Sequence, residues 1–388
     1  MRPHTAIFLA AMLVIPGLAP GVSRAQAVPR TDTPRGGTLR VSFEPVITTW
    51  DQEFTDSGKQ QIGVALYRAF PPTFSCTRVA GLLTCNIVAA NVLARAEKRV
   101  TPLFLEFGLS NRIALSARLP LVRVKVQAWR NTSTAGAILN SLLSDPIYDY
   151  APIQVTNRRL RYFAGDIEVG AKYRLLVGRH ANYATSVAFV ARLPTGHQDS
   201  PHDLFDIPTG DHQTDLEVQA AQELVVGRRL WLNAAVRVGR QLEGTRERRI
   251  GPPSTPLIPR AATALLNWRP GSYAAIDVAP LYRFGFAPTF GVGFTAGYWR
   301  KQPDHYRYRS AQDSIDVATR LGAPVAAGVL DAGTAERWVR LGVAMTYVGT
   351  DVEGSLSFER TVSGSGGGGR VPAATVFRIV MRTSRWPF

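Results

Sequence analysis

Hydrophobic residues alternate with polar or small residues along most of the chain from about residue 100 to the C-terminus. Residues 290–298 read FGVGFTAGY and residues 339–347 read VRLGVAMTY, so every second residue in them is apolar. Successive side chains of a β-strand point to opposite faces of the sheet. Each such segment therefore predicts a strand with one apolar face and one polar or small face.

The strands that this pattern predicts are long for a soluble protein. We expect them at 38–48, 101–109, 113–128, 161–176, 183–194, 213–225, 229–241, 272–284, 289–300, 336–347, 353–362 and 372–383. Strands in soluble sheets most often have about 5 to 6 residues, whereas about 9 to 11 residues cross a bilayer at a tilt. The lengths therefore favour a membrane-spanning barrel over a soluble β-sandwich, which shows the same alternation.

The connections between these strands alternate between long and short. The long ones are 49–100, 129–160, 195–212, 242–271, 301–335 and 363–371, and the short ones are 110–112, 177–182, 226–228, 285–288 and 348–352. Long extracellular loops and short periplasmic turns are typical of bacterial outer-membrane barrels. The pattern predicts an all-β fold, a transmembrane antiparallel up-and-down β-barrel of about twelve strands. Residues 261–268 could form a further strand, so a count of fourteen stays open.

The N-terminal residues have the features of a cleavable signal peptide. Arg2 precedes a mostly apolar stretch, 6–19, and residues 25–27 read AQA, the A-x-A pattern of a cleavage site. The apolar stretch is shorter than the roughly 20 residues of a helical membrane span, and a Pro-Gly pair interrupts it. We therefore expect residues 1–27 to be removed and residues 28–388 to form a single barrel in the bacterial outer membrane.

The first long connection, 49–100, differs from the rest of the chain. Its segments 60–70 and 86–98 contain clusters of Ala, Val and Leu and are expected to be helical or irregular. The two cysteines of the chain, Cys76 and Cys85, both lie in this connection. In an oxidising, exported compartment such a pair indicates a disulfide, and a free or metal-binding pair is the alternative. We expect a large extracellular loop that could fold inward and plug the pore.

The chain carries more positive than negative charge. Its 45 Lys and Arg and 29 Asp and Glu give a net charge of +16, which falls to +14 when the two arginines of the signal peptide are removed. A basic protein can bind nucleic acid, but the expected export to the outer membrane argues against nucleic-acid binding here. A positively lined pore or contact with anionic lipid fits the export route, and genome composition alone would also explain an Arg-rich chain.

The polar faces of the predicted strands line the lumen if the apolar faces meet lipid. On this basis we predict the following lumen-lining residues: Arg123, Lys125, Gln127, Glu168, Lys172, Arg174, Asp215, Glu217, Arg237, Arg340, Arg378 and Arg382. Charges of both signs could pair across the lumen and fill it, or they could line a water-filled channel. The excess of arginine favours anions if a pore exists.

Side chains for enzymatic chemistry do not form a recognisable pattern. Barrel enzymes that act on lipids need a Ser–His arrangement, and the histidines after the signal peptide fall in predicted turns and loops. His197, Asp199, His202 and the acidic residues up to His212 share one predicted loop. They could bind a divalent cation or form a solvated polar surface. We expect no enzymatic activity, no cofactor and no metal site.

Several short motifs carry a family resemblance. Residues 165–174 read GDIEVGAKYR, residues 191–196 read ARLPTG, and residues 107–112 read FGLSNR. Over residues 100–240 the chain resembles the outer-membrane β-barrels assigned as transporters of the meta-pathway of phenol degradation. The resemblance implies a barrel fold and uptake of small organic molecules, and it supplies no functional residues. The PTG of ARLPTG and the PTGD at 208–211 are expected to end the strands that flank one extracellular loop.

The sequence thus predicts an outer-membrane channel or uptake porin for small solutes, organic or anionic. A non-conducting structural or interaction barrel with an ion-paired lumen is the alternative, and a lipid-active enzyme is a third class. The expected partners are outer-membrane lipid and lipopolysaccharide, a small solute, and the barrel assembly machinery, which reads C-terminal aromatic residues such as Phe388. Nucleic acid is not an expected partner.

Overall fold

The computed structural model of the chain describes residues 30–55, 58–62, 73–79, 82–88, 92–130, 143–151, 159–178, 182–204, 206–227, 229–252, 255, 257–284, 289–349, 352–366 and 371–383. The expected signal peptide, residues 1–27, and the C-terminal Phe388 lie outside these ranges. Within them, no helix has the length and apolar character needed to cross a membrane.

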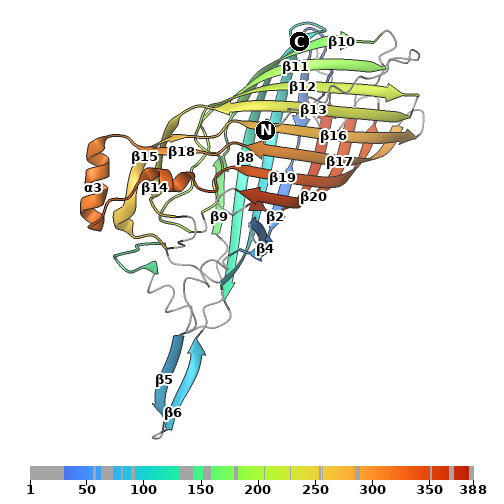
Figure 1. Ribbon diagram of the computed structural model, residues 1–388. Helices are drawn as coiled ribbons and strands as arrows, with labels where there is room; N and C mark the ends of the chain where they lie inside the picture. The colour runs from blue at the N-terminus through green and yellow to red at the C-terminus, as the bar shows by residue number, and fades with distance from the viewer. Residues whose placement is uncertain are drawn as a thin grey trace, which may run out of the picture.

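Most of the described residues belong to one closed antiparallel β-barrel (Figure 1). Its segments are β1 (Leu39–Phe43), β2 (Val46–Trp50), β7 (Val92–Gly108), β8 (Ile113–Arg130), β9 (Arg159–Ala164), β10 (Glu168–Val177), β11 (Tyr183–Arg192), β12 (Asp215–Val226), β13 (Leu230–Gln241), β16 (Tyr273–Phe284), β17 (Thr289–Lys301), β19 (Glu336–Val348), β20 (Val352–Gly366) and β22 (Thr375–Thr383). β1 continues into β2 and β9 into β10, so these fourteen segments make twelve strands. β22 pairs with β1 and β2, with Val41 opposite Thr383, and this pairing closes the barrel. Closure leaves the sheet without the unpaired edge that a bilayer does not tolerate.

The outer face of the barrel is apolar, whereas the inner face is polar or small. On β17 the outward-pointing Phe294 has 71% of its surface exposed, while its neighbour Thr295 points inward and is buried. The ring of Phe290 lies 5.3 Å from that of Tyr347 and 6.3 Å from that of Phe284, close to the short turns. An apolar belt with aromatic rings near its ends is the outer surface of an outer-membrane barrel.

The predicted alternation of short turns and long connections is confirmed. β8 follows β7 after residues 109–112, β13 follows β12 after residues 227–229, and β20 follows β19 after residues 349–351. Because neighbouring strands are antiparallel, all these turns lie at one end of the barrel and the long connections lie at the other. The short-turn end is the periplasmic end in barrels of this type.

Most of residues 261–268 do form a strand, β15, but this strand lies outside the barrel. It belongs to a subdomain made of β14 (Gly244–Arg249), η1 (Arg260–Ala262), β15 (Thr263–Arg269), β18 (His305–Tyr308), α3 (Ala311–Leu321) and η2 (Ala327–Asp331). β15 pairs with β14 and β18, and Val317 of α3 shares a buried core with Leu266, Trp268 and Tyr306. Two long extracellular connections thus fold together beyond the end of the barrel (Figure 1), and the barrel keeps twelve strands.

The first long connection contains four short strands, and two of them overlap segments that were predicted to be helical or irregular. It holds β3 (Gln52–Thr55), β4 (Gly58–Gln61), β5 (Thr73–Val79) and β6 (Leu82–Val88). The helical or irregular prediction for 86–98 is wrong, because β7 begins at Val92 and pairs with β8 over its whole length. Of the predicted segment 60–70, residues 63–70 lie outside the described residues. β3 also pairs with β21 (Val371–Pro372) of the last long connection.

The hairpin β5–β6 projects away from the barrel and not into its lumen (Figure 1). Its antiparallel register puts Cys76 directly opposite Cys85. Directly opposite positions bring two Cα atoms about as close as a disulfide requires. The disulfide itself stays a prediction.

Two motifs of the family resemblance, 165–174 and 191–196, meet at the base of the extracellular loop 193–214, whereas 107–112 covers the end of β7 and the short turn between β7 and β8. The carboxylate of Asp166 accepts hydrogen bonds from the backbone N–H groups of Gly196 (2.7 Å) and Asp211 (3.0 Å). A Cβ atom added to Gly210 would lie 2.3 Å from a carboxylate oxygen of Asp166, so only glycine fits there. One carboxylate therefore ties together both ends of the loop, and the motifs act as strand ends, as predicted.

Candidate functional site in the barrel lumen

The lumen of the barrel contains a cavity of about 450 Å³. Nine cationic side chains line it: Arg30, Arg40, Arg118, Lys172, Arg192, Arg237, Arg340, Arg378 and Arg382. Five acidic side chains line it: Glu44, Glu106, Glu168, Glu217 and Asp277. The lining therefore has four more cationic than acidic groups, an arrangement that favours anions in a pore.

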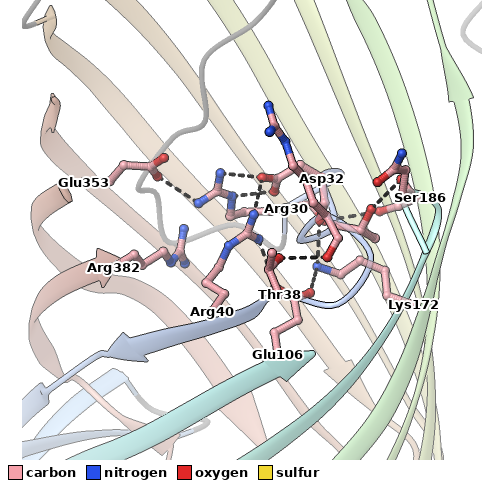
Figure 2. A network of polar contacts seen from close by, with 12 residues as sticks. Arg30, Asp32, Thr38, Arg40, Glu106, Lys172, Ser186, Glu353 and Arg382 are labelled. Carbon is pink, nitrogen blue, oxygen red and sulfur yellow. Dashed lines mark hydrogen bonds and ion pairs between the residues drawn. The ribbon is translucent and has the colours of Figure 1, made fainter. Parts of the chain in front are cut away.

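The N-terminal segment 30–36 lies in the lumen near its periplasmic end (Figure 2). Thr33 donates its hydroxyl hydrogen to the backbone carbonyl of Asn111, which lies in the short turn after β7 (2.9 Å). Lys172 on β10 donates to the backbone carbonyl of Asp32 (3.2 Å). The segment that precedes the first strand is thus held by side chains and turns of the barrel wall.

Ion pairs connect this segment to several sides of the barrel (Figure 2). Arg30 pairs with Glu353 on β20 (2.8 Å) and with Asp32 (2.7 Å). Asp32 also pairs with Arg40 on β1 (2.9 Å), and Arg40 pairs with Glu106 on β7 (2.9 Å). Buried pairs of this kind gain little net free energy over hydration, but removing one partner costs about 3–5 kcal/mol. The network therefore holds the segment across the lumen.

A second set of ion pairs lies on the other strands of the wall. Glu168 on β10 pairs with Arg118 (3.3 Å) and Arg192 (3.1 Å), and Arg192 also pairs with Asp215 (2.6 Å). Further pairs are Arg237–Asp277 (2.8 Å), Arg340–Glu359 (2.7 Å) and Arg382–Glu44 (2.9 Å). Most of the acidic groups in the lumen are therefore already bound to arginine.

Three aromatic rings form a wall on one side of the lumen, here called the aromatic wall: Tyr273, Trp299 and Trp338. The rings of Tyr273 and Trp299 are stacked with their centres 4.5 Å apart, and those of Trp299 and Trp338 are nearly parallel at 6.0 Å. The Tyr273 hydroxyl donates to Glu217 (2.6 Å). Gly239 makes room for Tyr273, because a Cβ atom there would lie 2.1 Å from its ring. Trp299 and Trp338 both line the cavity.

Most of the predicted lumen residues face the lumen. The cavity is lined by Glu168, Lys172, Glu217, Arg237, Arg340, Arg378 and Arg382. Asp215 is fully buried against Arg192, and Arg174 shares the inner face of β10 with Lys172. On these strands the polar residues of the alternation therefore lie on the inner face.

The structure corrects the placement of Arg123, Lys125 and Gln127. These residues share a face of β8 with the exposed Leu119 and Leu121, which is the outer face. The inner face of this part of β8 carries Val122, Val124 and Val126, which are buried in contact with Val100 and with Ile207 of the loop 193–214. This part of β8 extends beyond the membrane-facing belt, so its outer face meets water and its apolar face packs under a loop.

Several residues of the site were not among the predicted ones: Arg30, Asp32, Arg118, Arg192, Trp299 and Trp338. If Leu115 and Leu119 had been assigned to the lipid-facing side of β8, the alternation would have placed Arg118 on the other side, in the lumen. Arg30 and Asp32 precede the first strand and belong to no alternating segment. No sequence pattern indicates that such a segment turns back into the barrel.

The acidic and histidine side chains of the loop 193–214 go to different partners. Asp199 pairs with Arg246 and Arg248, whereas His202 contacts Arg249. Burial opposes ionisation of Asp199, but Arg246 and Arg248 outweigh it and lower the pKa of this carboxyl to about 2. Among the described residues no group of His, Cys, Asp and Glu side chains is arranged to hold a metal ion.

No family model matches the chain, and no curated protein matches its sequence. Among solved structures it is similar to the COG4313 outer membrane channel from Pseudomonas putida F1, with 8% sequence identity, a TM-score of 0.54, and 92% of this chain and 98% of that chain covered. The CymD monoaromatic hydrocarbon channel (12% identity, TM-score 0.36, 90% and 89% covered) and the TodX deltaS2S3 mutant monoaromatic hydrocarbon channel (10%, 0.34, 91% and 91%) also match. At these values the first likeness concerns the fold and the other two support no conclusion. The chain therefore has the fold of a bacterial outer-membrane β-barrel, and no sequence match supports the family resemblance of its motifs.

Proposed function

We propose that the protein is an outer-membrane channel for small solutes. The observation that carries this proposal is the cavity of about 450 Å³ inside a closed barrel, lined by charged side chains with an excess of cations. A lumen packed with apolar side chains would not carry such a charged lining, because polar groups without partners are costly away from water. The partners of this function are a small solute, lipid and lipopolysaccharide around the barrel, and the assembly machinery that inserts it.

The N-terminal segment 30–36 crosses the lumen in this conformation and narrows the path to the periplasm. Passage of a solute therefore requires this segment to move. Its anchors are the pairs that Arg30 and Asp32 make with Glu353 and Arg40. Because these anchors are ionic, high salt weakens any of them that water reaches.

The alternative is a non-conducting barrel whose lumen is filled by ion pairs. The dense pairing of Arg118, Glu168, Arg192 and Asp215 favours this alternative. In such a barrel the extracellular subdomain and loops would carry the function. The two proposals differ in whether ions pass.

Single-channel recording of the refolded chain 28–388 in a planar bilayer, under a salt gradient, decides between them. The channel predicts discrete current steps with a reversal potential of anionic sign. A second protein, 37–388, lacks the segment that crosses the lumen and should give larger steps. A folded, heat-modifiable barrel that conducts in neither form would contradict the channel and favour the filled barrel.

A further inference from the structure

The aromatic wall and the cation beside it do not take part in the network that holds the N-terminal segment. Trp299 on β17 and Trp338 on β19 lie directly opposite each other in the sheet, with both rings lining the cavity. The indole N–H of Trp299 is buried and has no hydrogen-bond partner among the described residues. A buried donor left without a partner costs free energy, so its position favours a ligand that carries an acceptor.

Arg340 lies at the edge of the aromatic wall. Its guanidinium carbon lies 5.1 Å from the centre of the Trp338 ring, and its Nε forms an ion pair with Glu359 (2.7 Å). Within the described part of the chain its two terminal nitrogens have no other protein partner, and the Arg340 side chain lines the cavity. Arg378 lines the same cavity and repels Arg340 electrostatically. An anion between the two cations would relieve this repulsion.

These groups together match one chemical class. A planar aromatic ring gains contact area and favourable edge-to-face contact with the edges of stacked indole rings. A carboxylate can accept two parallel hydrogen bonds from the terminal nitrogens of one arginine. A neutral ring would leave the donors of Arg340 and Trp299 without an acceptor, and an aliphatic carboxylate would offer no aromatic face to the ring edges of the wall.

We propose that the aromatic wall and Arg340 form a binding subsite for a small aromatic carboxylate, a single planar ring that carries one acidic group. The proposal rests on the proposed channel function for its biological role, since it names the solute that the lumen selects. Binding itself does not depend on conduction. The ring lies against Trp299 and Trp338, and the carboxylate lies on Arg340.

The test is calorimetric titration of the folded, detergent-solubilised chain 28–388 with three probes. Benzoate has the ring and the charge, benzyl alcohol has the ring without the charge, and cyclohexanecarboxylate has the charge without an aromatic ring. We expect benzoate to bind at least about tenfold more tightly than either of the other two. Equal affinity for benzoate and cyclohexanecarboxylate, or for benzoate and benzyl alcohol, would overturn the proposal.

Matched variants locate the binding site. Arg340→Gln should weaken benzoate about tenfold and leave benzyl alcohol unchanged, whereas Arg337→Gln, on the exposed outer part of the same strand, should change neither. Trp299→Leu should weaken both aromatic probes, and its control is Phe294→Leu on the lipid-facing side of β17. Trp299→Phe, which keeps a ring and loses the N–H, should recover most of the benzyl alcohol binding. Equal losses in a variant and its control would place the binding elsewhere and contradict the subsite.

Recording from the same proteins separates this proposal from the channel. Benzoate binding without current steps would support the subsite and contradict the channel function. Current steps that benzoate does not block, together with no heat of binding, would support the channel and contradict the subsite. Heat-modifiable migration in gels shows that each variant has folded, so a loss of binding cannot be a loss of the barrel.

Discussion

Replacing Glu106 by glutamine tests whether the ion pairs in the lumen stabilise the folded barrel. The Glu106 side chain is only 2% exposed and pairs with Arg40 (2.9 Å) and with Lys172 (2.6 Å). Glutamine has nearly the same size but no charge. The change therefore removes the acidic partner of two cations without opening a cavity.

The magnitude follows from the partners that remain. Removing one partner of a buried ion pair costs about 3–5 kcal/mol. Arg40 keeps its pair with Asp32 (2.9 Å), and Lys172 keeps its hydrogen bond to the Asp32 carbonyl (3.2 Å). We therefore expect a loss at the lower end, about 3 kcal/mol of unfolding free energy. Glu97→Gln is the matched control on the same strand.

The control works because the Glu97–Arg99 pair (2.6 Å) is exposed, with 19% and 45% of the two side chains accessible. Exposed pairs contribute about 0–1 kcal/mol. Reversible urea unfolding of the refolded barrel in lipid gives the free energies, and the double variant Glu106→Gln/Lys172→Gln should recover part of the loss. If Glu106→Gln costs no more than Glu97→Gln, water in the lumen screens these charges and the reasoning is refuted.

Three further predictions concern other parts of the molecule. Asp166→Asn should loosen the loop 193–214, because a neutral amide accepts hydrogen bonds from two backbone N–H groups more weakly than a carboxylate. Limited proteolysis of the intact barrel should cut this loop faster in the variant. Unchanged cleavage would contradict the role of Asp166 in holding the loop. The pKa of Asp199, lowered from 3.8 to about 2, gives the extracellular subdomain stability that is fully present above pH ~4 and is lost as the pH falls through about 2. The rate of hydrogen exchange of β14 should rise as the pH falls over this range. Asp199→Asn should abolish that rise. Gly239→Val should displace the Tyr273 ring and destabilise the barrel by about 1–3 kcal/mol, measured as a shift of the urea midpoint. Gly227 lies in a turn with open space around it, so the same change there would shift the midpoint only through backbone strain at its positive φ of 60°.

The barrel could be predicted from the sequence because its evidence is local. A bilayer outside and a polar lumen inside impose opposite requirements on alternate residues of every strand. Strands such as 272–284 and 289–300 were therefore placed within about one residue of β16 and β17. The order of short and long connections followed from counting along the chain, and it set which end of the barrel faces the periplasm.

The candidate site could be predicted only in part. Alternation shows that two faces of a strand differ, but it does not show which face meets lipid once the strand leaves the membrane. On β8 the same alternation continues past the belt, where Val122 and Val124 pack inward under a loop and Arg123 lies on the opposite face of the strand. On β10 and β12 the polar residues of the alternation lie on the inner face, whereas on this segment of β8 they lie on the outer face.

What the sequence by itself determined is the strand positions and the barrel architecture, since each depends on residues close together in the chain, whereas the export signal stays a prediction. What only the tertiary structure decided is how the lumen is filled. Arg30 meets Glu353 across more than three hundred residues, and Trp299 meets Trp338 because the long connection between β17 and β19 folds aside and leaves these strands adjacent. Ion pairs and ring stacking act over a few ångströms in space. Closure of the barrel decides which side chains come that close, and their separation along the sequence does not reveal it.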